Sequence, residues 1–260
     1  MQGRNSRFVL RTDKVDARLR VTRTIRRTQP FTRPIQIMTQ LTQKHSLLVP
    51  KTTRYYSLGT VQHLTNTVWF VLHGYGQAAE YFIKHFSALD PEQNVVIAPE
   101  GLSRFYIKGL KGRVGASWMT KEDREDEIKD QCEYLNAVAK DAGINLQNPK
   151  QKIVLLGFSQ GTSTAVRWLL NSGFKADAIV LWAGSFPHDV EPENIADHLV
   201  DGGFHYAYGT QDEFLKDINI EEKLAPLADQ GLNPTIWTFD GPHAMDRVVL
   251  GKISDAINKG

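Results

Sequence analysis

The segment KIVLLGFSQGTSTAVRWLL, residues 152–170, changes its pattern within two residues. Up to Gly157 it is a continuous apolar run, which is typical of a strand buried on both faces of a sheet. From Gln160 onward the apolar residues follow helical spacing. Between the two parts lies Ser159, in the pattern G-x-S-x-G. A buried strand that turns directly into a helix requires a sheet with helices packed against it, which restricts the fold to a layered α/β arrangement.

Strand and helix patterns alternate along most of the chain. Further β-rich runs occupy 53–59, 67–74, 94–99, 177–185, 204–209 and 233–241, and helical patterns occupy 79–89, 121–143, 218–231 and 244–260. Strands that alternate with helices favour parallel pairing, because each crossover helix returns the chain to the same edge of the sheet. We therefore predict an α/β fold with a mainly parallel central sheet and helices on both faces.

The first 37 residues differ in charge from the rest. They contribute +8 to the net charge of +2, and residues 38–260 contribute −6. We predict that 1–37 form a basic, disordered extension and that 38–260 form a single catalytic domain. Two other interpretations of 1–37 stay open. The arginine- and threonine-rich composition is similar to an organelle transit peptide, and the positive charge is also suited to binding nucleic acid.

Composition excludes several other classes of protein. Cys132 is the only cysteine, so an intramolecular disulfide and a cysteine-rich zinc site are excluded. No apolar run approaches the roughly 20 residues that span a membrane, and no secretory signal segment is present. We expect a cytoplasmic protein without stable membrane insertion, or an organellar one if residues 1–37 are a transit peptide.

Ser159 lies where a nucleophile elbow is expected. The pattern G-x-S-x-G alone is weak, since chance supplies it in about one chain of this length in ten at average residue usage. Its position between a strand and a helix makes it much more specific. Gly157 and Gly161 leave room for a sharp turn that lifts the serine oxygen above the sheet. The helix that begins at Gln160 then directs free N–H groups toward the same point.

A serine needs a base within hydrogen-bond reach before it becomes a nucleophile. The histidines after Ser159 are His188, His198, His205 and His243. The first two lie in a polar stretch, and His205 lies inside a strand, where a structural role is expected. His243 directly follows the last strand, so it can lie over the carboxyl edge of the sheet. We predict His243 as the general base.

The acid that orients the histidine is predicted from its position in the chain. In FHYAYGTQDEF a strand ends at Gly209, and the following loop presents Asp212 and then Glu213. Loops after parallel strands gather at the carboxyl edge, where sites form. We predict Asp212 as the acid, with Glu213 as the fallback, although Asp212 could also cap a helix. Asp240 lies too close to the base in the sequence to reach its ring from the required side.

Acyl transfer also requires donors for the developing oxyanion. The backbone N–H of Gln160, next to the nucleophile, is the first candidate. The loop at 73–77 follows an earlier strand and contains Gly74 and Gly76, which makes the backbone of Tyr75 the second candidate. The alternative is that 73–77 is only a structural turn.

The long segment 99–126 follows a strand and is expected to be irregular and to border the site. Its apolar residues Phe105, Tyr106, Trp118 and Met119 are candidates for an acyl pocket. The alternative is that they only pack the segment against the core.

Four motifs together resemble one known family. His73-Gly74-Tyr75-Gly76, GFSQG, GTQDEF and GPHAM occur in the order found in the phospholipase/carboxylesterase family of α/β-hydrolases, which includes the acyl-protein thioesterases. The resemblance implies a serine esterase without a metal or diffusible cofactor. It also implies Ser159, Asp212 and His243 as a triad, with Tyr75 and Gln160 as oxyanion donors. The family often has an acid at the position of Gln77 and a glycine at that of Thr162.

The leading hypothesis is a serine hydrolase that cleaves small carboxylic esters through an acyl-enzyme intermediate. An acyl thioesterase or lysophospholipase is the alternative within the same chemistry. A non-catalytic binding protein with the α/β-hydrolase fold is the alternative outside it. We expect a monomer or homodimer with no nucleic-acid partner.

Overall fold

The computed structural model describes residues 42–62, 65–147, 149–200 and 203–259. The predicted extension 1–37 and its boundary at Met38 lie outside these residues. No regular secondary structure occurs in residues 42–54. The compact unit that contains all elements below spans Pro50–Gly260.

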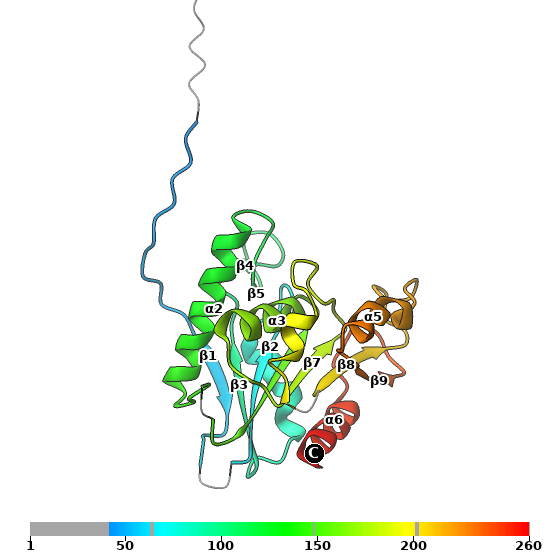
Figure 1. Ribbon diagram of the computed structural model, residues 1–260. Coiled ribbons are helices and arrows are strands. Elements are labelled where there is room, and N and C mark those ends of the chain that lie inside the picture. Colours follow the sequence, from blue (N-terminus) through cyan, green and yellow to red (C-terminus); the bar gives the residue numbers. More distant parts are fainter. Residues whose placement is uncertain (1–41, 63–64, 148, 201–202, 260) are drawn as a thin grey trace, which may run out of the picture. The chain divides into compact units, whose positions relative to one another are not determined.

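A seven-stranded sheet forms the centre of this unit (Figure 1). The strands are β1 (Tyr55–Leu58), β2 (Thr67–Leu72), β3 (Asn94–Pro99), β6 (Lys152–Phe158), β7 (Ala178–Trp182), β8 (Phe204–Gly209) and β9 (Thr235–Phe239). Their spatial order is β1-β3-β2-β6-β7-β8-β9. The edge strand β1 runs antiparallel to β3, and the other neighbouring pairs are parallel. The predicted mainly parallel sheet is confirmed.

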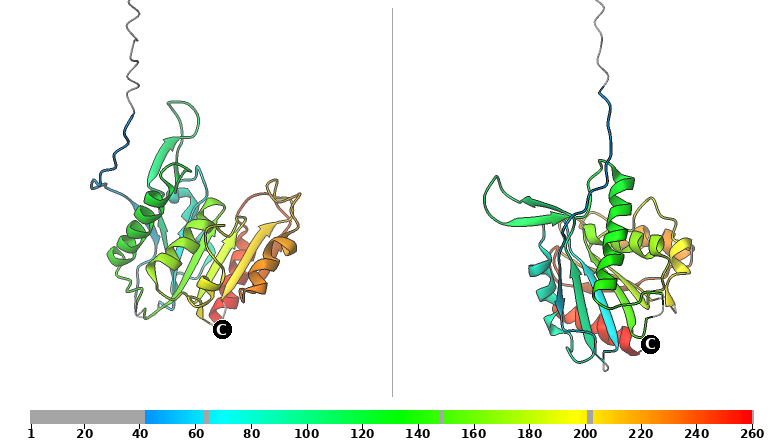
Figure 2. Two further views of the ribbon diagram at one scale, coloured as in Figure 1. Left: turned by 45° about the horizontal axis from the view of Figure 1, so that its top comes forward. Right: turned by 90° about the vertical axis from the view of Figure 1, so that its left-hand side faces the viewer.

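Helices cover both faces of the sheet (Figure 2). They are α1 (Ala79–Phe82), the 3₁₀-helix η1 (Ile83–Ala88), α2 (Arg124–Asp141), α3 (Gln160–Ser172), α4 (Glu193–Ala196), α5 (Ile220–Asp229) and α6 (Arg247–Lys259). On β2, Phe70 packs in a core with residues of α2, α3 and α5. The next side chain, Val71, packs in a second core with residues of η1 and α6. Alternate side chains thus enter opposite cores, which explains the continuous apolar runs.

Two segments differ from the sequence prediction. The helical pattern at 79–89 forms one α-helical turn and then a 3₁₀-helix, a difference in hydrogen bonding that apolar spacing does not encode. The segment 99–126 is not wholly irregular, because β4 (Ser103–Tyr106) and β5 (Val114–Ser117) form an antiparallel hairpin. This hairpin extends away from the central sheet (Figure 2).

The parallel strands bring distant parts of the sequence to one edge of the sheet. The strands β2, β6 and β8 end at Leu72, Phe158 and Gly209. The segments after them begin with His73, Ser159 and Thr210, and the segment after β9 contains His243. Since all four strands point the same way, these segments gather at the carboxyl edge, where open α/β sheets form their sites.

Candidate active site

Ser159 occupies a strained turn between β6 and α3. Its backbone angles are φ 52° and ψ −115°, outside the regions that a residue with a side chain ordinarily adopts. A Cβ at Gly157 would collide with the carbonyl oxygen of Gly161, and one at Gly161 with that of Leu72. Both glycines are therefore required by close backbone contacts, as predicted, and the turn that presents the serine hydroxyl depends on them.

Asp212 and His243 are direct hydrogen-bond partners. The Oδ2 atom of Asp212 lies 2.7 Å from Nδ1 of His243. The aspartate side chain is buried, and its Oδ1 accepts the backbone N–H of Phe214 at 2.9 Å. A buried carboxylate that accepts the Nδ1–H leaves Nε2 of the imidazole as a proton acceptor. The two residues thus have the geometry of an oriented general base.

Two aromatic rings pack against the imidazole of His243. The ring of Phe158 lies 4.9 Å from it, centroid to centroid, and the ring of Phe214 packs edge-on at 4.8 Å. Phe158 directly precedes Ser159. The imidazole therefore lies beside the turn that carries the serine.

The other acidic and histidine candidates have different partners. Glu213 accepts the backbone N–H of His243 at 3.4 Å, not a ring nitrogen. Asp240 accepts the side-chain N–H of Gln211 at 2.6 Å. His205 accepts the indole N–H of Trp237 at 3.2 Å within the sheet, as expected of a structural histidine.

The loop 73–77 packs directly on the serine turn. A Cβ at Gly74 would lie 3.2 Å from the Cβ of Ser159. The backbone N–H of Gly74 donates to Oε1 of Gln77 at 2.8 Å, and that of Gly76 donates to the carbonyl of Ala116 at 2.9 Å. In the described part of the chain, the N–H groups of Tyr75 and Gln160 have no acceptor. Two free donors therefore lie close to the serine, as an oxyanion site requires.

The buried side chain of His73 connects the same loop to the segment after β3. Its Nε2 accepts the N–H of Gly101 at 3.0 Å, so the ring proton resides on Nδ1, which lies 2.8 Å from the carbonyl oxygen of Gly74. Complete burial lowers the pKa of this imidazole and keeps it neutral. His73 is thus a structural support for the loop.

Gln160 has a second role that sequence reasoning missed. Its side-chain Oε1 accepts the N–H of Trp118 at 3.1 Å, and its Nε2 donates to the carbonyl of Met119 at 2.9 Å. These contacts connect the first residue of α3 to the end of the β4–β5 hairpin. Only the residue's position after the serine could have drawn attention to it, and that position predicts a backbone role.

The four predicted pocket residues do not form one wall. Phe105 stacks on Tyr75, with ring centroids 5.1 Å apart, and therefore lies beside the loop 73–77. Tyr106 is exposed to solvent. Trp118 is buried in the core, where its indole N–H donates to the carbonyl of His73 at 2.8 Å. Met119 is half-buried, and its sulfur lies 3.3 Å from a guanidinium nitrogen of Arg167.

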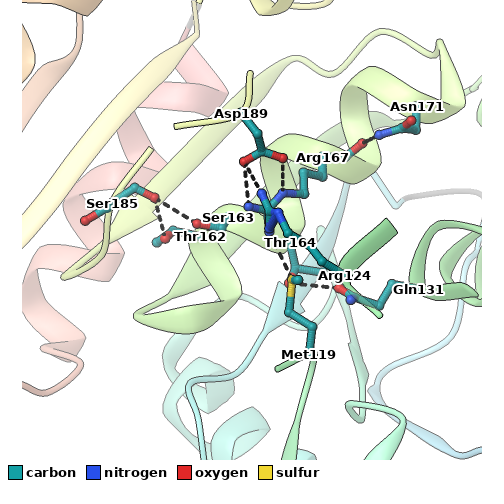
Figure 3. Close-up of polar contacts among 10 residues, drawn as sticks. All are labelled: Met119, Arg124, Gln131, Thr162, Ser163, Thr164, Arg167, Asn171, Ser185 and Asp189. Atoms are coloured by element: carbon teal, nitrogen blue, oxygen red, sulfur yellow. Dashed lines mark hydrogen bonds and ion pairs between the residues drawn. The ribbon is translucent and has the colours of Figure 1, made fainter. Parts of the chain in front are cut away.

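One end of the loop after β7 is attached to the first turn of α3 (Figure 3). Ser185 lies in this loop, and its backbone carbonyl accepts hydrogen bonds from the hydroxyls of Thr162 at 3.0 Å and Ser163 at 3.3 Å. The Thr162 hydroxyl also lies 2.7 Å from the carbonyl of Ser159. Thr162 therefore connects the loop to the serine turn, a role that a glycine at this position could not have.

Two arginines attach the same loop at its other end (Figure 3). Asp189 accepts hydrogen bonds from Nη2 and Nε of Arg167 at 2.8 and 3.1 Å, and Nη2 of Arg124 lies 2.6 Å from the same carboxylate. The two guanidinium groups hold the pKa of Asp189 well below its usual range. The carboxylate thus joins the loop to both α2 and α3, and we call these three residues the Asp189 cluster.

Residues 42–62, 65–147, 149–200 and 203–259 contain no group of three or more His, Cys, Asp or Glu side chains able to hold a metal ion. None of their helices combines the length and apolarity needed to cross a bilayer.

Several solved structures share this fold. Esterase PE8 superposes with a TM-score of 0.59 at 19% identity, over 80% of this chain and 99% of that one. The Zea mays acyl-protein thioesterase 2 gives a TM-score of 0.56 at 14% identity, over 80% and 99% of the two chains. The Bacillus cereus carboxylesterase gives 0.54 at 19% identity, over 80% and 92%.

Comparison of sequences identifies the family and not only the fold. No curated protein matches the chain significantly. The family model described as Phospholipase/Carboxylesterase matches residues 61–259, which include the serine turn, the loop 73–77 and the Asp212–His243 pair. The chain therefore belongs to the phospholipase/carboxylesterase family, and its sheet is that of an α/β-hydrolase.

Proposed function

We propose that this protein is a carboxylesterase-type serine hydrolase in which Ser159, Asp212 and His243 form the catalytic triad. The observation that carries the proposal is the 2.7 Å contact between Asp212 and His243. It occurs at the sheet edge where Ser159 occupies a strained strand-to-helix turn. An oriented imidazole beside a presented hydroxyl is the arrangement that nucleophilic acyl transfer requires.

In the first half-reaction, the Ser159 oxygen attacks the ester carbonyl while Nε2 of His243 takes the hydroxyl proton. The negative charge that develops on the carbonyl oxygen is stabilised by the N–H groups of Tyr75 and Gln160. The imidazolium is stabilised by the Asp212 carboxylate. When the tetrahedral species collapses, the bond to the alcohol breaks, and His243 transfers its proton to the leaving oxygen.

In the second half-reaction, water replaces the serine as nucleophile. His243 takes a proton from the water as its oxygen attacks the acyl carbonyl. Collapse releases the carboxylic acid and returns the proton to Ser159. The free enzyme is restored without any metal or redox group taking part.

Labelling with a fluorophosphonate probe tests the nucleophile. The parent protein should become covalently labelled, and Ser159→Ala should not. Ser163→Ala is the matched control, because it removes a hydroxyl one helical turn away that contacts only the carbonyl of Ser185. Equal labelling of Ser159→Ala and the parent would contradict the proposal.

An acyl thioesterase activity is the second candidate. It is supported by the similarity to the Zea mays acyl-protein thioesterase 2, whose fold covers most of this chain. The same two half-reactions would cleave a thioester, with a thiol as the leaving group. The ratio of kcat/KM for short p-nitrophenyl esters to kcat/KM for long-chain acyl thioesters separates the two candidates. A ratio well above one favours the esterase.

A further inference from the structure

Lys223 on α5 is a half-buried cation close to the candidate active site. Its ammonium donates a hydrogen bond to Oγ of Ser185 at 3.0 Å. An ammonium has three N–H donors, and a hydroxyl is a neutral partner. In the described part of the chain, no carboxylate lies within ion-pair distance of this ammonium.

The negative charge that acts on this ammonium, that of Asp212, already has other hydrogen-bond partners. The carboxylate of Asp212 attracts the ammonium electrostatically, but its two oxygens accept from His243 and from the N–H of Phe214. Burial lowers the pKa of Lys223, while the charge of Asp212 opposes that change. Burying part of a cation without a paired anion costs folding free energy. The position of Lys223 therefore favours an anionic ligand as its partner.

The carbonyl of Ser185 is held against the first turn of α3 (Figure 3). Its carbonyl lies within hydrogen-bond distance of the Thr162 and Ser163 hydroxyls in the first turn of α3. A Cβ on the preceding residue, Gly184, would collide with the carbonyl of Ser159. The Asp189 cluster fixes the far end of the loop. The backbone of Ser185 is therefore fixed against the first turn of α3, and the hydroxyl is held by its contact with Lys223.

The two side chains together provide two donor groups, a hydroxyl and an ammonium, that suit a carboxylate. The Ser185 oxygen accepts from Lys223, so its own hydroxyl proton remains free to donate, and the ammonium keeps two further N–H groups. A carboxylate has two oxygens that can accept one bond from each residue. A phosphate monoester would leave more charge and more acceptors unmatched, because sites for it use several donors or an arginine fork.

We propose that Lys223 and Ser185 form a subsite that binds a carboxylate group on the ester substrate and so determine substrate specificity. This inference rests on the proposed esterase function and names the class of ester that it favours. The contact is present both before and during acyl transfer. Its loss therefore raises KM for acidic esters and leaves kcat largely unchanged.

Two pairs of matched esters test the subsite and show which side of the ester carries the carboxylate. On the acyl side, the p-nitrophenyl half-ester of glutaric acid is compared with p-nitrophenyl valerate. On the alcohol side, 4-carboxyphenyl butyrate is compared with 4-carbamoylphenyl butyrate. We expect Lys223→Met to lower kcat/KM for the acidic member of one pair about tenfold, through KM, and to leave its neutral partner within about twofold.

Three further variants make the test specific. Lys223→Arg should retain the preference for the acidic ester, and Ser185→Ala should lose part of it. Lys216→Met removes an exposed positive charge from the neighbouring loop and should leave the preference unchanged. An equal loss on acidic and neutral esters, or no change in either pair, would overturn the subsite. Turnover of the neutral esters by Lys223→Met shows that the esterase function holds independently.

Discussion

The side-chain carbonyl of Gln77 accepts the backbone N–H of Gly74 at 2.8 Å. This bond closes the turn from inside the loop, together with the bond from the N–H of Gln77 to the carbonyl of Gly74 at 3.2 Å. The N–H of Tyr75, the residue after Gly74, is left without an acceptor in the described part of the chain. The turn thus pairs the N–H groups of Gly74 and Gln77 internally and leaves the N–H of Tyr75 as a free donor.

Removing this bond should weaken catalysis more than binding. Gln77→Leu leaves the N–H of Gly74 unpaired and loosens the turn, so the N–H of Tyr75 is no longer fixed at the oxyanion. We expect kcat to fall about tenfold with little change in KM, less than the loss of a whole donor. Steady-state kinetics on p-nitrophenyl butyrate measure this. Gln77→Glu retains an acceptor and should keep most of the activity, and similar losses in both variants would contradict this role.

Parts of this site could be predicted from the sequence because their causes are local. Gly157 and Gly161 mark a turn whose neighbours leave no room for a side chain, and the patterns on either side of Ser159 identify it as a strand-to-helix junction. His243 lies in the short segment between the last strand and the last helix. In each case the order of elements along the chain determines which edge of the sheet a residue reaches.

Replacing Asp212 should abolish most activity without unfolding the protein. In Asp212→Asn, the amide oxygen that accepts the N–H of Phe214 leaves the NH2 group facing Nδ1 of His243, so the imidazole is held in the wrong tautomer and loses its counter-charge. We expect kcat to fall by about 10³–10⁴-fold. Glu213→Gln is the matched control, since Glu213 contacts only the backbone N–H of His243. The kcat of Glu213→Gln should stay within about threefold of the parent. A larger loss of kcat in Glu213→Gln than in Asp212→Asn would indicate that Glu213, and not Asp212, is the acid of the triad.

Other features could not be predicted because they depend on tertiary contacts. The strands of the β4–β5 hairpin are only four residues long and flank a glycine- and lysine-rich turn, which gives no clear periodicity. Trp118 lies in the same segment, but its indole bonds to the distant His73 carbonyl and makes it a core residue. Lys223 lies on an ordinary amphipathic helix. Only the fold brings its ammonium to Ser185.

The Asp189 cluster should contribute measurably to stability. Asp189→Asn leaves the nearly buried guanidinium of Arg167 without its counter-charge. The cost should be about 2 kcal/mol in the free energy of unfolding, below the range for fully buried pairs because the Asp189 side chain is 29% exposed. Urea denaturation measures it. The control is Glu133→Gln, which breaks the exposed Lys129–Glu133 pair and should cost only a few tenths of a kcal/mol.

This contribution should also depend on pH. Because the pKa of Asp189 is lowered in the folded state, the carboxylate stabilises the fold above its unfolded pKa of about 3.9. Protonation removes that stabilisation as the pH falls below this value. The difference between parent and Asp189→Asn should be constant from about pH 8 to about pH 5 and decrease below about pH 4. A difference that grows toward low pH would contradict the assignment.

The thiol of Cys132 should be unreactive in the folded protein. Burial raises its pKa to about 11, so almost no thiolate is present near neutral pH. Dithionitrobenzoate at about pH 8 should modify the native protein at least tenfold more slowly than the protein unfolded in guanidinium. Equally fast modification of both would show that the thiol is accessible in the fold.

The β4–β5 hairpin has a closely packed base and an exposed tip. At its base, a Cβ on Gly115 would collide with the backbone of Gly76, and Ala116 exchanges two hydrogen bonds with the loop 73–77. At its tip, Leu110 is 90% exposed. Substitutions at the exposed tip should therefore leave the backbone contacts between the base of the hairpin and the loop 73–77 intact. The close backbone contacts at the base thus restrict substitution there, whereas the exposed Leu110 at the tip can be replaced without loss of buried contacts.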